Sequence, residues 1–105
     1  PSRSNSPTLS CNMFIGSLYF ECYIPGAQSL KHKRQALRSF KDRLKNKFNV
    51  AVAEVDHQDK WQRAGVAVVT VSGNHQFVTS LMDEIERFAL TFPSLTASVQ
   101  QKEVL

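Results

Sequence analysis

Stretches with strand periodicity and stretches with helical periodicity alternate along this chain, and their order restricts the folds it can adopt. In residues 14–24, every second residue from Leu18 to Ile24 is apolar, which predicts a strand with one core face. The predicted order is strand 14–24, helix 30–47, strands 49–56 and 62–71, helix 75–92 and strand 95–103. Two β-α-β halves in this order predict an α+β ferredoxin-like sandwich. Its four-stranded antiparallel sheet has the order 4-1-3-2 and carries both helices on one face.

The ends of both predicted helices carry boundary signals. Ser29 and Asn74 stand at N-cap positions, and Pro93 stops the second helix. The apolar stripe predicted for the first helix is Leu30, Leu37, Phe40 and Leu44. The stripe predicted for the second is Phe77, Leu81, Ile85, Phe88 and Phe92, with Val78, Met82 and Ala89 beside it. These stripes predict which helix faces pack on the sheet.

Length and composition predict a single cytoplasmic domain. Of the 105 residues, 1–12 are rich in Ser, Pro and Asn and predict a flexible arm, which leaves 13–105 as one domain. No apolar run approaches the roughly 20 residues that cross a bilayer. The two cysteines have no metal-ligand spacing, and the histidines at 32, 57 and 75 fall on different elements. We therefore expect no metal and no cofactor.

Positive charge is concentrated in one short segment. Eight of the thirteen lysines and arginines fall between residues 31 and 47, beside one acid, Asp42. This window carries a formal charge of +7, whereas the rest of the chain sums to −3. Five of the eight follow the 3/4 spacing of one helix face and form what we call the basic ridge: Lys31, Arg34, Arg38, Lys41 and Lys45. At 1.5 Å per residue, the ridge is about 21 Å long.

The basic ridge predicts a nucleic-acid-binding surface. Clustered cations bind phosphates with salt-dependent and sequence-independent affinity, and folded RNA is often recognised by shape. The predicted function is non-catalytic RNA or ribosome binding through the first helix. Two alternatives stay open. The ridge could be an ordinary solvated helix face, or it could meet an acidic protein partner in a dimeric adaptor with no nucleic-acid role.

The sheet face without helices predicts a homodimer. Tyr19 and Tyr23 of the first strand point to it, and the second and third strands are expected to add valines. That assignment turns Ala51, Ala53 and Val55 towards the helices. The predicted interface is Tyr19, Tyr23, Val50, Val52, Val66 and Val68. Base stacking on the two tyrosines is the alternative, but the third strand has no aromatic residue to complete such a platform.

The connection at residues 57–63 is the strongest candidate for acid–base chemistry. His57, Asp59 and Arg63 fall within it, but no serine or cysteine nucleophile lies nearby. A tight turn, with Gln58 or Asp59 bonding the backbone and Trp61 as an anchor, is favoured. The chain also lacks the Gly-rich arginine loop of acylphosphatase, an enzyme built on the same scaffold. We therefore expect no catalytic residues and no enzyme activity.

Three stretches resemble a known family. They are IPGAQSLKHKR (24–34), FKDRLKNKFNVAVAEV (40–55) and DHQDKWQRA (56–64), and they are similar to the YlxP-like family, a bacterial family of unknown function. The resemblance runs from about Met13 to the end of the chain. It implies a ferredoxin-like fold, a cytoplasmic location and, from the genes that neighbour the family's gene, a translation or ribosome-biogenesis context. The residues before Met13 and the pair Thr70-Val71 depart from the family pattern.

Overall fold

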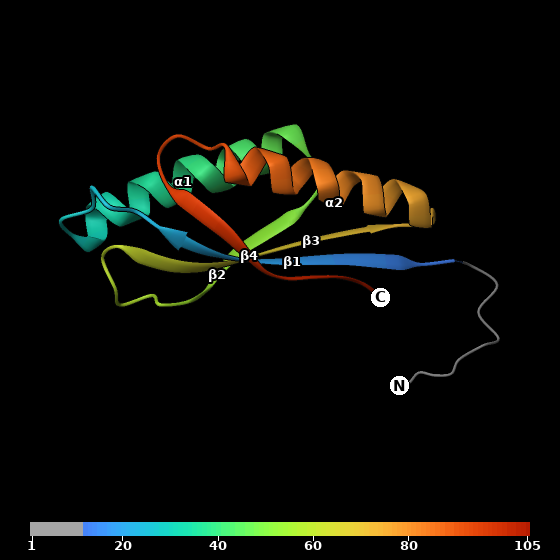
Figure 1. The fold of residues 1–105 in the computed structure, drawn as a ribbon, viewed down its shortest axis with the longest axis horizontal. Coiled ribbons are helices and arrows are strands. Elements are labelled where there is room, and N and C mark those ends of the chain that lie inside the picture. The colour runs from blue at the N-terminus through green and yellow to red at the C-terminus, as the bar shows by residue number, and fades with distance from the viewer. Residues whose placement is uncertain (1–11) are drawn as a thin grey trace.

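The computed structural model describes residues 12–105, so the predicted flexible arm lies outside it except for Asn12. Six elements follow one another in the predicted order (Figure 1). They are β1 (Phe14–Tyr23), α1 (Leu30–Lys47), β2 (Ala51–Asp56), β3 (Arg63–Ser72), α2 (His75–Leu90) and β4 (Thr96–Val104). The predicted elements are thus confirmed, with ends that differ by at most two residues.

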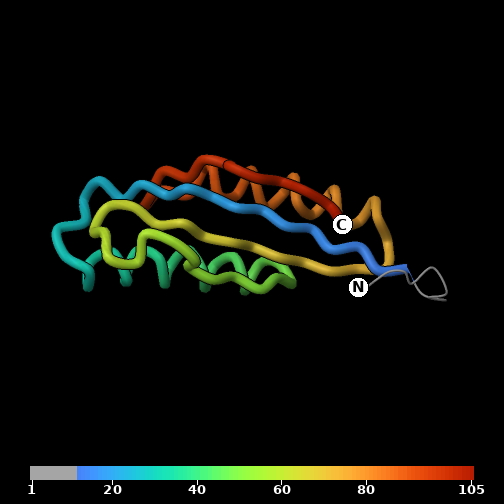
Figure 2. The backbone as a smooth tube through the Cα atoms, turned by 90° about the horizontal axis from the view of Figure 1, so that it is seen from below, coloured from blue at the N-terminus to red at the C-terminus, as the bar shows by residue number. Residues whose placement is uncertain are grey.

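The four strands form one antiparallel sheet of order β2-β3-β1-β4. This order is the predicted one, and both helices lie on the same side of the sheet (Figures 1 and 2). Helix α1 packs near the β2 edge, whereas α2 packs over β1 and β4. The α+β ferredoxin-like architecture is therefore confirmed, and none of residues 12–105 forms a helix on the opposite sheet face.

Capping and close packing explain where the helices begin and how near they lie to the sheet. The Ser29 hydroxyl oxygen accepts a hydrogen bond from the His32 amide at 3.1 Å, so Ser29 caps α1 as predicted. Asn74 caps α2 in the same way, through Phe77. Gly16 lets α2 approach β1 closely, since a Cβ atom there would lie 2.8 Å from Val78 Cγ1.

The side chains of β2 and β3 face the opposite way from the prediction. Val66 and Val68 pair directly with Phe20 and Leu18, and directly paired residues share one face of a sheet. Because Phe20 and Leu18 are buried under the helices, both valines are buried there as well. The same register turns Val50 and Val52 towards the core and leaves Ala51, Ala53 and Val55 exposed.

The predicted dimer interface is therefore wrong as a set. Val66 and Val68 are 0% and 1% exposed inside the monomer, so no second chain can reach them. Val50 and Val52 pack against the same core. Only Tyr19 and Tyr23 lie on the open face. Strand β3 has apolar residues on both of its faces, so its sequence alone did not determine which residues point inward.

The stripe of α2 is also shifted from the predicted one. Its buried residues are Val78, Leu81, Met82, Ile85 and Ala89. Phe77, predicted to belong to the apolar stripe, is 54% exposed. The shift turns Phe88 and Phe92 towards α1, where they pack around Phe40 with ring centroids 6.4 Å and 5.1 Å away. Within residues 12–105, neither helix is long and apolar enough to cross a membrane.

Candidate nucleic-acid interface

The basic residues of α1 lie on three different sides of the helix. Successive residues turn by 100°, and the buried side is formed by Lys33, Leu37, Phe40 and Leu44. The five residues of the basic ridge lie together on the flank that faces the β2 edge. Four of them are exposed and Lys41 is half-buried. The ridge predicted from the sequence is therefore one continuous surface.

A groove of about 430 Å³ runs along this flank. The lining residues are Arg34, Leu37, Arg38, Lys41, Asp42, Lys45 and Glu54. Four of the five ridge residues thus line one concave surface, whereas Lys31 lies one turn before it. Leu37 forms part of the wall, and Glu54 reaches it from β2. The groove could not be predicted from α1 alone, because β2 supplies its other side.

The charges of the ridge are not neutralised within the described fold. Among residues 12–105, no carboxylate oxygen lies within 4.0 Å of a nitrogen of any ridge side chain. Two of the three acids of α2 are engaged elsewhere, since the Lys102 ammonium lies 2.6 Å from Asp83 and 2.9 Å from Glu86. The hydrogen bond from Lys102 lowers the pKa of the Asp83 carboxyl. The ridge side chains are therefore not held in ion pairs, and four of them outnumber the two acids, Asp42 and Glu54, that line the same groove.

One basic residue of segment 31–47, Lys33, is buried and stabilises the fold, so it is not part of the exposed basic surface. Lys33 is 1% exposed, and its ammonium lies 2.9 Å from Glu54 Oε2. It also donates a hydrogen bond to the His57 carbonyl oxygen at 2.6 Å. A sequence signal for this role existed, because Lys33 follows the 4/3/4 spacing of the buried stripe with Leu37, Phe40 and Leu44. The charge that α1 offers to a partner is therefore smaller than its composition indicates.

Comparison with known proteins identifies the family. The family described as "Protein of unknown function (DUF503)" matches residues 15–101. This chain belongs to the DUF503 family. It is also 34% identical over 89 residues to the "Uncharacterized protein YlxP" of Bacillus subtilis (strain 168), an alignment that covers 85% of this chain and 97% of that protein. The YlxP-like resemblance seen in the sequence is confirmed.

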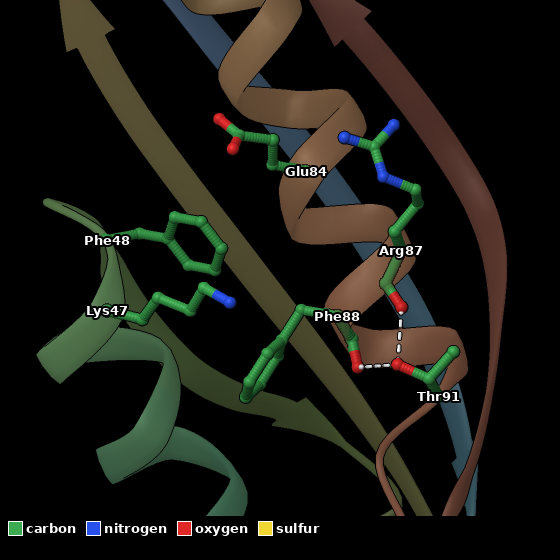
Figure 3. A pocket seen from close by; sticks show the side chains of 6 residues that line it. All are labelled: Lys47, Phe48, Glu84, Arg87, Phe88 and Thr91. Carbon is green, nitrogen blue, oxygen red and sulfur yellow. Dashed lines mark hydrogen bonds between the residues drawn. The ribbon is translucent and has the colours of Figure 1, made fainter.

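Two further basic residues of this DUF503 chain lie on the opposite flank of α1, facing α2. The Lys47 ammonium is 5.7 Å from the centroid of the Phe48 ring and 5.6 Å from that of Phe88 (Figure 3). Arg43 lies 6.0 Å from the Phe92 ring. These are cation–π distances. Lys47 thus joins α1 to Phe88 of α2, and both residues line a hollow of about 300 Å³ between the helices.

Of the three residues considered for acid–base chemistry, only His57 and Arg63 lie close to a common partner. The Glu21 carboxylate on the open sheet face lies 2.6 Å from His57 Nε2 and 3.4 Å from an Arg63 nitrogen, and it accepts a hydrogen bond from Tyr19. Partial burial, followed by the Glu21 charge, raises the pKa of Tyr19. Asp59 has no part in this cluster. The sequence prediction missed Glu21, which is the residue that brings the others together.

The turn itself is built differently from the expectation. Gln58 bonds the Glu54 carbonyl oxygen as predicted, and the Lys60 amide closes the turn on the His57 carbonyl. Trp61, predicted to anchor the turn, is instead 55% exposed. Within residues 12–105, no three His, Cys, Asp or Glu side chains are grouped as metal ligands.

Proposed function

We propose that this protein binds RNA, without catalysis, through the basic ridge of α1. One observation supports the proposal above all: five cationic side chains lie on one flank of a single helix, and four of them line one groove. Side chains arranged in this way can contact successive phosphates of a nucleic-acid backbone. Their affinity depends on the release of counterions, so it falls steeply as salt rises.

Structured RNA, including ribosomal RNA, is the polyanion we favour. A rigid helix offers a fixed spacing of charges, which suits a folded RNA recognised by its backbone and shape. The open sheet face is a poor alternative for RNA, because Glu21 and Glu103 lie on it and its Arg63 is already close to Glu21. The proposed function is therefore that of a small RNA- or ribosome-binding factor that works in the cytoplasm.

The test is binding of the purified protein to ribosomal subunits and to a structured ribosomal RNA fragment. Lys31, Arg34, Arg38 and Lys41 are changed together to Glu, and circular dichroism checks that the fold persists. We expect binding to collapse in this variant, since each change replaces an attraction for phosphate with a repulsion. Unchanged binding by a folded variant would reject the proposal.

An acidic protein partner is the competing outcome. The same groove could accept a carboxylate-rich segment, which would make the chain a protein–protein adaptor. Isolation of the tagged protein from cells, with and without nuclease treatment, separates the two. Partners that disappear with nuclease support the RNA proposal, whereas a protein partner that persists and needs the ridge contradicts it.

A further inference from the structure

Both described helices lie on one side of the sheet (Figure 1), and the other side carries an apolar area. Its members alternate with the core-facing residues of three neighbouring strands, and we call them the sheet patch: Ile15, Ala51, Ala53, Ala67, Val69 and Val71. The register brings them together, since Val71 pairs with Ile15, and Val69 pairs with Ala51. Val69 is 38% exposed and Val71 is 57% exposed.

We propose that the sheet patch binds the same patch of a second copy of this chain. A contact of this kind is isologous, so the surface must be complementary to itself. An apolar patch meets that condition, whereas the basic ridge would set like charges against each other. Two alanines of the patch lie on the edge strand β2 and one on β3, and their short side chains let a second sheet pack against this face at about 10 Å.

The size of the open face can be compared with that of a standard dimer interface. A ten-residue strand such as β1 is about 33 Å long, and four strands at about 4.8 Å spacing span about 19 Å. Because β2 has only six residues and β4 nine, the projected face is at most roughly 600 Å², and side-chain relief makes the accessible area larger. A stable interface buries about 800 Å² on each partner. The face thus approaches the area that a standard dimer needs.

The surroundings of the patch also suit a protein partner. Glu21, His57 and Arg63 form a mutually compensated polar cluster at one end of the face. A polar rim beside an apolar centre is the usual anatomy of a protein interface. Since both helices lie on the other side of the sheet, the dimer leaves each basic ridge exposed. The dimer is therefore compatible with the proposed RNA binding but does not depend on it.

Sedimentation velocity across a range of protein concentrations tests this proposal. The wild type should sediment as a dimer of the 11.8 kDa chain. The double variant Val69→Glu/Val71→Glu should weaken the dimer at least about 100-fold, because it buries two carboxylates without partners. The matched control is Phe77→Glu/Leu90→Glu on α2, whose side chains are 54% and 52% exposed on the helix side. This control should dimerise like the wild type.

Three results would overturn the proposal. They are a wild type that remains monomeric at about 100 µM, a folded Val69→Glu/Val71→Glu variant that dimerises normally, and a control that loses the dimer equally. If the valine variant does not fold, Ala53→Arg on the exposed strand β2 replaces it and should give the same dissociation. In the first of these cases, dimerisation that appears only after removal of residues 1–11 would assign the patch to that segment.

Discussion

Lys33 lies 2.9 Å from Glu54, and this ion pair joins the buried side of α1 to strand β2. The Glu54 side chain is 19% exposed, so the pair sits at the boundary of the core. The same ammonium holds the His57 carbonyl, and His57 has a φ of 58°, which a non-glycine residue rarely adopts. Lys33 therefore fixes the turn after β2 as well as the strand.

Lys33→Ala is expected to lower the free energy of unfolding by about 3 kcal/mol, because it removes a packed stem and leaves Glu54 without its partner. Urea denaturation measures the loss. Lys31→Ala, an exposed change on the same helix, should stay within about 0.5 kcal/mol of the wild type. Equal stability of the two variants would show that the buried pair contributes nothing.

Gly65→Ala is expected to destabilise the fold by about 1–3 kcal/mol, because the new methyl group would collide with the Tyr19 hydroxyl and lie 2.8 Å from Asp56 Cβ. Tyr19→Phe removes the hydroxyl, so it should recover part of the loss when combined with Gly65→Ala. A thermal-unfolding double-mutant cycle measures this coupling. If the effects of Gly65→Ala and Tyr19→Phe on stability were strictly additive, the loss would not arise from contact between the new methyl group and the Tyr19 hydroxyl.

The sequence predicted the elements well because each has an independent local signal. Strand β1 is apolar at every second residue from Leu18 to Cys22, so Leu18 and Phe20 were assigned to the core correctly. The cap residues Ser29 and Asn74 fixed the starts of both helices. These features depend on residues that are close together in the chain.

The errors arose where the answer depends on pairing between distant residues. Strand β3 could point either set of valines inward, and only its register with β1 decides the matter. The helical spacing of Lys33 placed it on the buried side of α1, but the acid that compensates its charge, Glu54, comes from β2 and could not be assigned from α1 alone. The ridge itself was predictable from helical spacing, but its groove was not, since the second wall comes from another element.

Cys22 gives the fold a dependence on alkaline pH. Burial raises the pKa of its thiol from 9.0 to about 12. Since the unfolded chain releases this proton first, stability declines above about pH 9, with a loss of about 1.4 kcal/mol by pH 10. Urea denaturation at pH 8 and pH 10 tests this in a Cys11→Ser background, with added Cys22→Ala as the control. An equal decline in both proteins would contradict the assignment to Cys22.

The two flanks of α1 offer a charge-matched test of the RNA proposal. Arg34→Gln/Arg38→Gln removes two charges from the ridge, whereas Arg43→Gln/Lys47→Gln removes two from the flank that packs on Phe92 and Phe88. Both variants have the same net charge, so a difference between them reports position alone. If each ridge arginine neutralises one phosphate, its double variant should reduce the slope of log affinity against log salt by about 1.4–1.8.

The Arg43/Lys47 variant should keep most of that slope, although loss of its ring contacts should cost some stability, at about 0.5–1 kcal/mol per contact. Fluorescence anisotropy with a structured RNA, at several salt concentrations and well below the unfolding temperature, measures both slopes. Equal losses would mean that affinity follows net charge rather than the ridge. That result would contradict a defined RNA surface on the β2 side of α1, because two charges on opposite flanks of a helix cannot contact the same stretch of backbone equally.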